Sequence, residues 1–362
     1  MAMDLMPVDR IPDWKERIER QDAFWDRKIL DRPVVHIAFP REKPLVPWPA
    51  RKTHASVRER WMDAEYVADW AHAMAMNTEH MGDALPAANP NLGPEIFSAF
   101  FGAELEYTND TSWAVPCIRE WGEAGKLAFS KENAYWRKLE ELTAALLARG
   151  KGAFYTGLTD FHPGADAIAA FRDPEVMNVD MIEHPDEVRR MVRVVTDAYL
   201  KVLDHWFGRL AAAGQAFTCW AGIVSTRRWY VPSNDFSCMI SSPMFDDFFL
   251  PGIREECRHT AASIYHLDGP GALHHLDSLL AIPELNAIQW VSGAGKGPET
   301  RWLHVYRKCQ EAGKGIQLGV DAQDLEFFLG NLKPEGVWLR VGGVRNRKEG
   351  EAIIRRVSGW RR

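Results

Sequence analysis

The chain has 362 residues, of which 46% are hydrophobic and 26% charged, and its formal net charge is -6 at pH 7. This composition is ordinary for a soluble globular protein, and the negative charge removes the electrostatic basis for binding nucleic acid. The five cysteines show no C-x-x-C spacing and no run of about 18 apolar residues occurs, so we expect a cytoplasmic protein without disulfides, a thiolate zinc site or a membrane partner.

Short apolar or β-branched runs alternate with long amphipathic stretches along the chain, as in repeated strand-helix units. After a leading helix over residues 13 to 27, we predict strands at 33–39, 83–88, 152–157, 215–221, 262–267, 286–291, 315–320 and 337–341. Eight strands, most of them followed by a helix, predict a closed (β/α)8 TIM barrel. We expect one domain over residues 1–362, in which residues 1–30 are a leading helical extension.

Two of the helices between the strands carry clear end signals. The first begins with Pro185, Asp186 and Glu187 and should end at Gly214. The second should begin at Ser242 as its N-cap and break near Pro251.

Two insertions interrupt the alternation of strands and helices. Residues 40 to 56 form a proline-rich loop after the first strand, and residues 89 to 130 contain a short helix and a hairpin after the second. Because the loops that follow the strands of a barrel carry its active site, both insertions should lie on the functional side.

The stretch YHLDGPGALHHLD, residues 265 to 277, contains three histidines and two aspartates around a Gly-Pro-Gly turn. Side chains alternate along a strand, so Ile264, His266 and Asp268 share one face. If Ile264 fills the barrel interior, His266 and Asp268 emerge at its carboxyl rim. Asp268 is equally suited to capping the helix that follows. The pair supplies only two of the four ligands that zinc takes, so metal binding stays open.

Polar and aromatic residues at the other predicted strand ends complete a candidate pocket. Carboxylates and imidazoles suit proton transfer, guanidiniums suit an anionic group, and indoles suit a ring. For each residue the alternative is a salt bridge, a helix cap or packing. As catalytic groups we predict Asp235, His266 and Asp268. As substrate-binding residues we predict Asn89, Asp160, His162, Trp220, Arg227, Arg228, Trp229, Trp290 and Arg340. At the same rim we place Asn91, Asp166, Lys296, Asp321 and Arg345.

Three runs in fixed order resemble the uroporphyrinogen decarboxylase (URO-D) superfamily: AGQAFTCWAG, then NDFSCMISSPMFDDFFLPGI, then a strand ending YHLDGPG. The upstream run GLTDFHPGADAIAAFRDPEVMNVDMIEHPDEV is similar to that family's third strand and the helices after it. The resemblance covers residues from about 30 to 360 and implies the same eight-stranded barrel. It also implies one-carbon chemistry, with a corrinoid protein as partner in the methyltransferase branch and zinc held by His266 and Asp268.

The chain departs from that family at two places. The loop after the first strand offers Arg41 but not the Arg-rich, Gln-containing sequence that binds porphyrinogen, which argues against that substrate. The zinc methyltransferases use His-x-Cys and a distant cysteine, whereas this chain has His266-x-Asp268, and Gly342 and Gly343 follow its last strand. The soft sulfur ligands are therefore absent.

Methyl transfer of the corrinoid-linked type, on a small anionic or ring-containing substrate, is the function that the sequence favours. A decarboxylase (a lyase) acting on a porphyrinogen-like or other carboxylate substrate is the first alternative. A carbohydrate-active enzyme with a Trp-lined site is the second, because the chain has 15 Trp. A non-catalytic binding barrel is the third. The sequence is compatible with a homodimer and does not identify the substrate.

Overall fold

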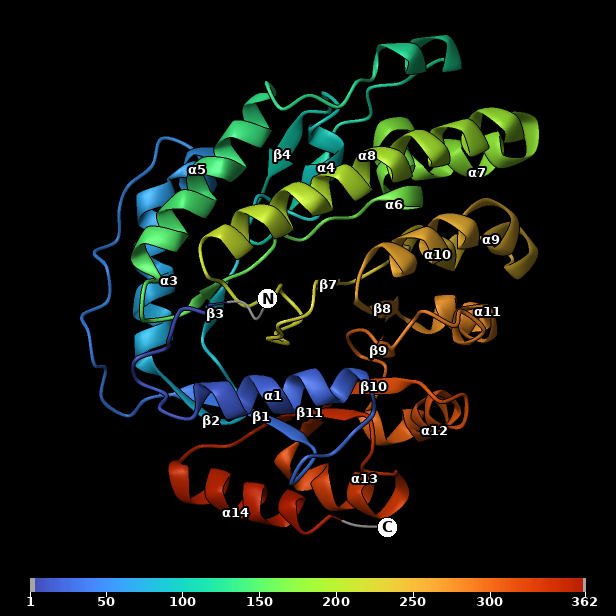
Figure 1. The fold of residues 1–362 in the computed structure, drawn as a ribbon. Coiled ribbons are helices and arrows are strands. Elements are labelled where there is room, and N and C mark those ends of the chain that lie inside the picture. The colour runs from blue at the N-terminus through green and yellow to red at the C-terminus, as the bar shows by residue number, and fades with distance from the viewer. Residues whose placement is uncertain (1–3, 361–362) are drawn as a thin grey trace.

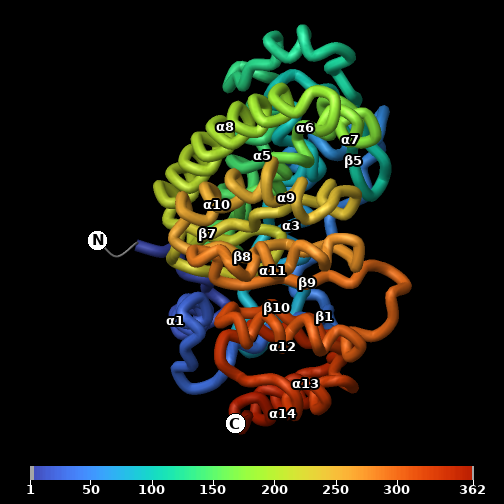
Figure 2. Tube along the Cα trace, turned by 90° about the vertical axis from the view of Figure 1, so that its right-hand side faces the viewer, coloured from blue at the N-terminus to red at the C-terminus, as the bar shows by residue number. Residues whose placement is uncertain are grey.

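A computed structural model describes residues 4–360 as a mixed α/β fold with its strands inside and its helices outside (Figure 1). The main sheet has seven strands in the order β2-β1-β11-β10-β9-β8-β7. Its strands are β1 (Val34–Pro40), β2 (Thr78–Gly82), β7 (Trp229–Tyr230), β8 (Ala262–Asp268), β9 (Ala287–Val291), β10 (Gly315–Asp321) and β11 (Val337–Gly342). All neighbours pair parallel except β1 and β2, which are antiparallel. Figure 2 shows β7 to β10 following one another in this order.

Two smaller sheets belong to the first half of the chain. Strands β3 (Ala87–Ala88) and β6 (Tyr155–Thr156) pair parallel. Strands β4 (Leu105–Tyr107) and β5 (Ser112–Ala114) form an antiparallel hairpin within the second insertion. The predicted hairpin is therefore confirmed.

Strand assignments agree with the sequence best in the second half of the chain. Strands β1, β8, β9, β10 and β11 each lie within one or two residues of a predicted strand. Of the strands predicted at 83–88 and 152–157, only the two-residue strands β3 and β6 are formed. Strand β2 was not predicted.

The predicted strand at 215–221 is wrong. The chain turns back at Gly222, whose φ of +80° suits a residue without a side chain, and Phe217 forms an isolated antiparallel bridge with Ser225. The backbone therefore returns to the amino end of the sheet before it enters β7.

The closed barrel is consequently not formed as a continuous ring of paired strands within residues 4–360. Single backbone hydrogen bonds bridge two of the interruptions: Asp83 N–H donates to Val35 O (2.7 Å), and Leu158 N–H donates to Thr218 O (2.8 Å). The structure establishes a parallel sheet surrounded by helices.

The helices lie outside the sheet and are numbered in chain order. They are α1 (Trp14–Trp25), α2 (Val57–Met62), α3 (Ala64–Asn77), α4 (Ile96–Ala99), α5 (Ala134–Arg149), α6 (Gly164–Arg172), α7 (Pro174–Glu183), α8 (Pro185–Ala212), α9 (Ser242–Phe248), α10 (Leu250–His259), α11 (Leu276–Leu280), α12 (Leu303–Glu311), α13 (Leu325–Asn331) and α14 (Arg347–Ser358). Short 3-10 helices are η1 (Trp121–Lys126), η2 (Asp235–Met239), η3 (Pro270–His275), η4 (Glu299–Trp302) and η5 (Ala322–Asp324). None of the helices in residues 4–360 combines the length and the apolar character that crossing a membrane requires.

The end signals of the helices are largely confirmed. Helix α8 starts at Pro185, and Gly214, with a φ of +66°, follows its end. Helices α9 and α10 are separated at Phe249, two residues before Pro251, which is the second residue of α10. Ser242 is not the N-cap, because Ser241 occupies that position and makes no capping hydrogen bond through its side chain.

Helix α1 covers the amino end of the sheet. The Gln21 side chain donates to Asp83 O (3.0 Å) and accepts from Val224 N–H (2.9 Å) and Trp338 Nε1–H (3.2 Å). Trp338 lies near the start of β11, so α1 occupies the side where the parallel strands begin. The carboxyl ends of the strands, on the opposite side, are left free to build a pocket.

Candidate functional site

Strand β8 delivers two polar side chains to the carboxyl end of the sheet. His266 is half-buried and Asp268 exposed, while Tyr265 and Leu267 between them are buried. Helix η3 begins after Gly269 without a side-chain cap, so Asp268 does not cap it. Partial desolvation by the surrounding protein raises the pKa of Asp268; nearby His266 opposes this rise, and the negative charge of Asp235 adds to it.

Asp235 comes from η2 and joins these two residues. One donor atom from each of Asp235, His266 and Asp268 lies within 4.8 Å of the other two. Helix η2 is held in place by Asp166, whose carboxylate accepts the backbone N–H groups of Asp235 (3.0 Å) and Phe236 (2.8 Å). Two segments about thirty residues apart in sequence, η2 and β8, therefore bring these three residues together at one end of the sheet.

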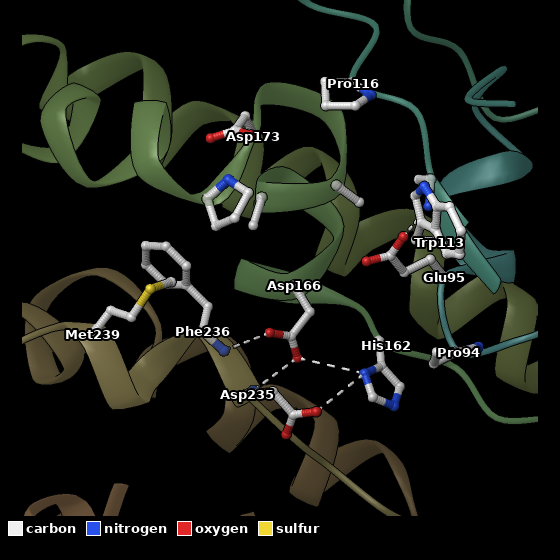
Figure 3. Close-up of a pocket in the computed structure, with 14 residues that line it drawn as sticks. Pro94, Glu95, Trp113, Pro116, His162, Asp166, Asp173, Asp235, Phe236 and Met239 are labelled. Carbon is white, nitrogen blue, oxygen red and sulfur yellow. Dashed lines mark hydrogen bonds and ion pairs between the residues drawn. The ribbon is translucent and has the colours of Figure 1, made fainter. Parts of the chain in front are cut away.

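Figure 3 shows the His162 ring facing the carboxylates of Asp166 and Asp235. Its Nε2 is 3.3 Å from Asp160 Oδ1, and its Nδ1 is 3.7 Å from Asp235 Oδ2 and 3.8 Å from Asp166 Oδ2. Burial alone would lower the pKa of His162, but the hydrogen bond to Asp160 and the three negative charges raise it to about 10. In the metal-free protein this imidazole is therefore protonated at neutral pH.

A cavity of about 540 Å³ opens beside this cluster. Its charged lining residues are His162, Asp166, Asp235, Glu95 and Asp173 (Figure 3). Burial and the charge of Asp235 raise the pKa of Asp166 to about 6. The remaining walls are largely apolar and include Pro94, Trp113, Pro116, Ala169, Ala170, Pro174, Phe236 and Met239.

A chain of side-chain amides, which we call the amide relay, orients His266. His266 Nδ1 is 2.6 Å from Gln289 Oε1, Gln289 Nε2 donates to Gln317 Oε1, and Gln317 Nε2 donates to Ala221 O (2.8 Å). The three side chains lie in register on β8, β9 and β10.

The end of the amide relay sets the direction of every bond in it. A backbone carbonyl can only accept, so Gln317 donates to Ala221 O and must accept from Gln289 through its own oxygen. Gln289 Oε1 then accepts from His266 Nδ1–H. The other ring nitrogen, Nε2, is left free to hold a metal or to exchange a proton.

Several other predicted residues lie near this centre. The Trp220 ring meets the His266 ring edge to face at 5.1 Å. Asn89, Trp220 and Arg340 line a cavity of about 220 Å³. Trp290 and Arg340 line another of about 380 Å³, although Trp290 is only 4% exposed and packs on Trp302.

Arg227, Arg228 and Trp229 do not lie at this end, and their predicted placement is wrong. Because the chain turns back at Gly222, Arg227 and Arg228 precede β7, Trp229 is its first residue, and all three lie where the strands begin. Arg227 forms a two-pronged ion pair with Asp26 after α1 (2.7 and 2.9 Å).

The other two residues of this group also have structural contacts at the amino end. Arg228 lies 3.8 Å from the carboxylate of Asp204. Trp229 is 1% exposed, and its Nε1–H donates to Phe217 O (3.0 Å).

Two more predicted rim residues make local contacts. Asn91 Oδ1 accepts from Gly93 N–H (2.8 Å), and Asp321 Oδ1 accepts from Gln323 N–H (3.1 Å). Sequence reasoning missed Gln289 and Gln317. Their signal was a single glutamine at the centre of one apolar strand, AIQWV, and near the start of another, GIQLGVD, whose only other polar residue is the terminal Asp321.

Comparison with known proteins finds a solved structure with a similar fold. No family model matches the chain, and no curated protein matches it. Among solved structures it is similar to a methyltransferase from Methanosarcina mazei, with a TM-score of 0.59 and 10% sequence identity. The likeness covers 94% of this chain and 98% of that one, so the two share a fold over nearly their whole lengths.

Proposed function

We propose that this chain is a methyltransferase of the URO-D superfamily, built as one (β/α)8-type domain, that binds a divalent cation such as zinc through Asp235, His266 and Asp268. The observation that carries the proposal is the convergence of these three residues from η2 and β8 at the carboxyl end of the sheet. The fold that the chain shares with a methyltransferase supports it.

The donor set fits a divalent cation on two structural grounds. Asp235 Oδ1 is buried without a hydrogen-bond partner, so a ligand-competent oxygen is not otherwise engaged. The amide relay leaves one nitrogen of His266 free, as a supporting hydrogen bond does for most metal-binding histidines. Two carboxylates and an imidazole suit zinc, manganese or iron, and without thiolates the site favours oxygen or nitrogen substrates. When bound, such a cation would supply Lewis acidity toward a substrate heteroatom.

Other residues of the chain would transfer protons and shape the substrate cavity. His162, which lies within ion-pair distance of Asp160 and Asp235, can in its protonated form donate a proton to a leaving group or stabilise a negative charge that develops near it. The buried apolar residues of the cavity wall, Phe236, Ala169 and Ala170, would limit access of water to one reactant. A methyl-carrying corrinoid protein is the partner that we propose.

Methyl transfer can be tested with free methylcobalamin as donor. The zinc-loaded protein is incubated with methylcobalamin and a panel of small alcohols, amines and thiols, and demethylation is followed by absorbance and product mass. We expect transfer to at least one acceptor, and Asp235→Asn should reduce its rate by about 100-fold or more. Asp247→Asn, on exposed α9, is the matched control and should keep full activity. Equal rates for Asp235→Asn and the control would contradict the proposal.

Decarboxylation is the second candidate, and the protonated His162 favours it. A decarboxylase must deliver a proton to the carbon that loses carbon dioxide, and an imidazolium beside a cavity can do so. Release of carbon dioxide from a carboxylate substrate, lost in His162→Gln, would identify this reaction. A Trp-lined sugar site gains less support, because Trp229 and Trp290 are buried in the fold and a single described Trp, Trp113, lines the 540 Å³ cavity.

A further inference from the structure

Arg340 projects from β11 on the side of the sheet where His266 and Gln317 lie. Its register neighbours are Gly319 on β10 and His36 on β1. It lines both the 380 Å³ cavity with Trp290 and the 220 Å³ cavity with Trp220. The side chain is accessible to a molecule in either space.

No carboxylate within residues 4–360 forms an ion pair with Arg340. Its contacts are a hydrogen bond from Nη2 to Ala221 O (3.3 Å) and the face of the Trp338 ring, 5.6 Å from the guanidinium carbon. His36 beside it is neutral, because burial and then the Arg340 charge lower its pKa to about 3. The Arg340 guanidinium is therefore exposed to the cavities, and its donors that do not bind Ala221 O are available to an anionic ligand.

The backbone around Arg340 leaves space for such a ligand. A Cβ at Gly319 would meet no atom within 4 Å, so the register neighbour of Arg340 leaves open volume. On the other side, a Cβ at Gly222 would lie 2.6 Å from Arg340 Nη2. Gly222 thus allows the guanidinium to reach Ala221 O, and Gly319 leaves the adjacent space empty.

The same carbonyl connects Arg340 to the catalytic centre. Ala221 O accepts from Arg340 Nη2 and also from Gln317 Nε2, the last donor of the amide relay that begins at His266. A ligand bound to Arg340 would therefore lie at the same end of the sheet as His266.

We propose that Arg340 binds the carboxylate of a small organic acid, and that this acid is the substrate whose reacting atom lies toward His266. The second half of this statement rests on the proposed function; the carboxylate subsite does not. A carboxylate fits better than a phosphate because Arg340 is the one cation among the described residues lining the 380 Å³ cavity. Glu299, held there by Ser292 (2.9 Å) and Tyr306 (2.7 Å), adds a negative charge that disfavours a dianion.

Binding of acetate and of inorganic phosphate to the full chain tests the subsite. The protein is first stripped of metal and dialysed, so that a cation at Asp235 cannot account for binding, and dissociation constants are measured by NMR titration. We expect saturable acetate binding in the millimolar range, weakened about tenfold or more in Arg340→Gln. Arg228→Gln, at the opposite end of the sheet, is the matched control and should bind acetate like the wild type.

A second variant separates lost binding from lost folding. Gly319→Leu keeps the charge of Arg340 but fills the space beside it, and should also weaken acetate binding about tenfold. Unchanged acetate binding in a folded Arg340→Gln protein, or no saturable binding in the wild type, would overturn the subsite. Tighter binding of phosphate than of acetate would overturn the carboxylate assignment. Since no metal and no methyl donor are present, failure of the methyl-transfer test would leave this result unaffected.

Discussion

Replacing Gln289 by methionine should weaken the candidate metal site without touching a proposed ligand. Methionine has nearly the volume of glutamine but can neither accept from His266 Nδ1–H nor donate to Gln317 Oε1. Each lost hydrogen bond contributes about 1 kcal/mol, and leaving Gln317, which is 6% exposed, partly unpaired adds about 1 kcal/mol more. We therefore expect the free energy of unfolding to fall by about 2–3 kcal/mol.

The zinc affinity should fall as well. Freed from the amide relay, the imidazole of His266 can rotate or carry its proton on the nitrogen that the metal needs, and loss of such a support typically costs about 10–100-fold in affinity. Chelator competition gives the zinc affinity, and urea unfolding of the metal-free protein gives the stability. Gln323→Met, on η5, is the control and should change neither quantity. An unchanged zinc affinity in a destabilised Gln289→Met protein would refute the role assigned to the amide relay.

Two further predictions concern stability, and both are measured by urea unfolding. Burial raises the pKa of Glu256 from 4.5 to about 8, so the stability that this carboxyl contributes is complete below pH 4.5 and is lost as the pH rises through 8. Glu256→Gln cannot ionise, so it should be more stable than the wild type at pH 9 by about 1–3 kcal/mol and show no such gain at pH 4.5. An equal gain in stability at both pH values would contradict burial of the charge as the cause. Asp83 is fully buried, pairs with Arg32 (2.9 Å) and accepts from Val35 N–H (2.8 Å), so Asp83→Asn should cost about 3–5 kcal/mol. Asp247→Asn, which breaks the exposed pair with Arg189 (2.7 Å), should cost less than about 1 kcal/mol, and similar losses for the two variants would argue against a buried ion pair at Asp83.

Local sequence signals predicted the second half of the fold well, for a physical reason. Strands β8 to β11 are short, continuous apolar runs between helices with clear ends, and each is paired on both sides or covered by a helix. In the first half, β3 and β6 are held by two register pairs, and the chain around Gly222 turns instead of extending. An apolar run in this half of the chain indicates that the residues are buried but not that they pair as a strand. The sequence at 215–221 therefore could not distinguish a strand from a buried turn.

Regular strands and the turn at Gly222 explain which site residues the sequence placed at the correct end of the sheet and which it did not. His266 and Asp268 lie on a regular strand, so alternation alone gave their side and their end of the sheet. Arg227 was assigned to the rim because it follows an assumed strand, and a reversal of the backbone moved it to the opposite end, beside Asp26. Contacts of this kind depend on tertiary packing against α1, which no local pattern encodes.

Elemental analysis of the zinc-loaded chain after removal of free metal tests the proposed centre most directly. We predict one zinc ion per chain for the wild type and for the surface variant Asp247→Asn. His266→Gln and Asp268→Asn should each retain little of it, because each removes one of three donors that lie within 4.8 Å of one another. Equal zinc content in all four proteins, or none in the wild type, would contradict the assignment of Asp235, His266 and Asp268 as a metal site.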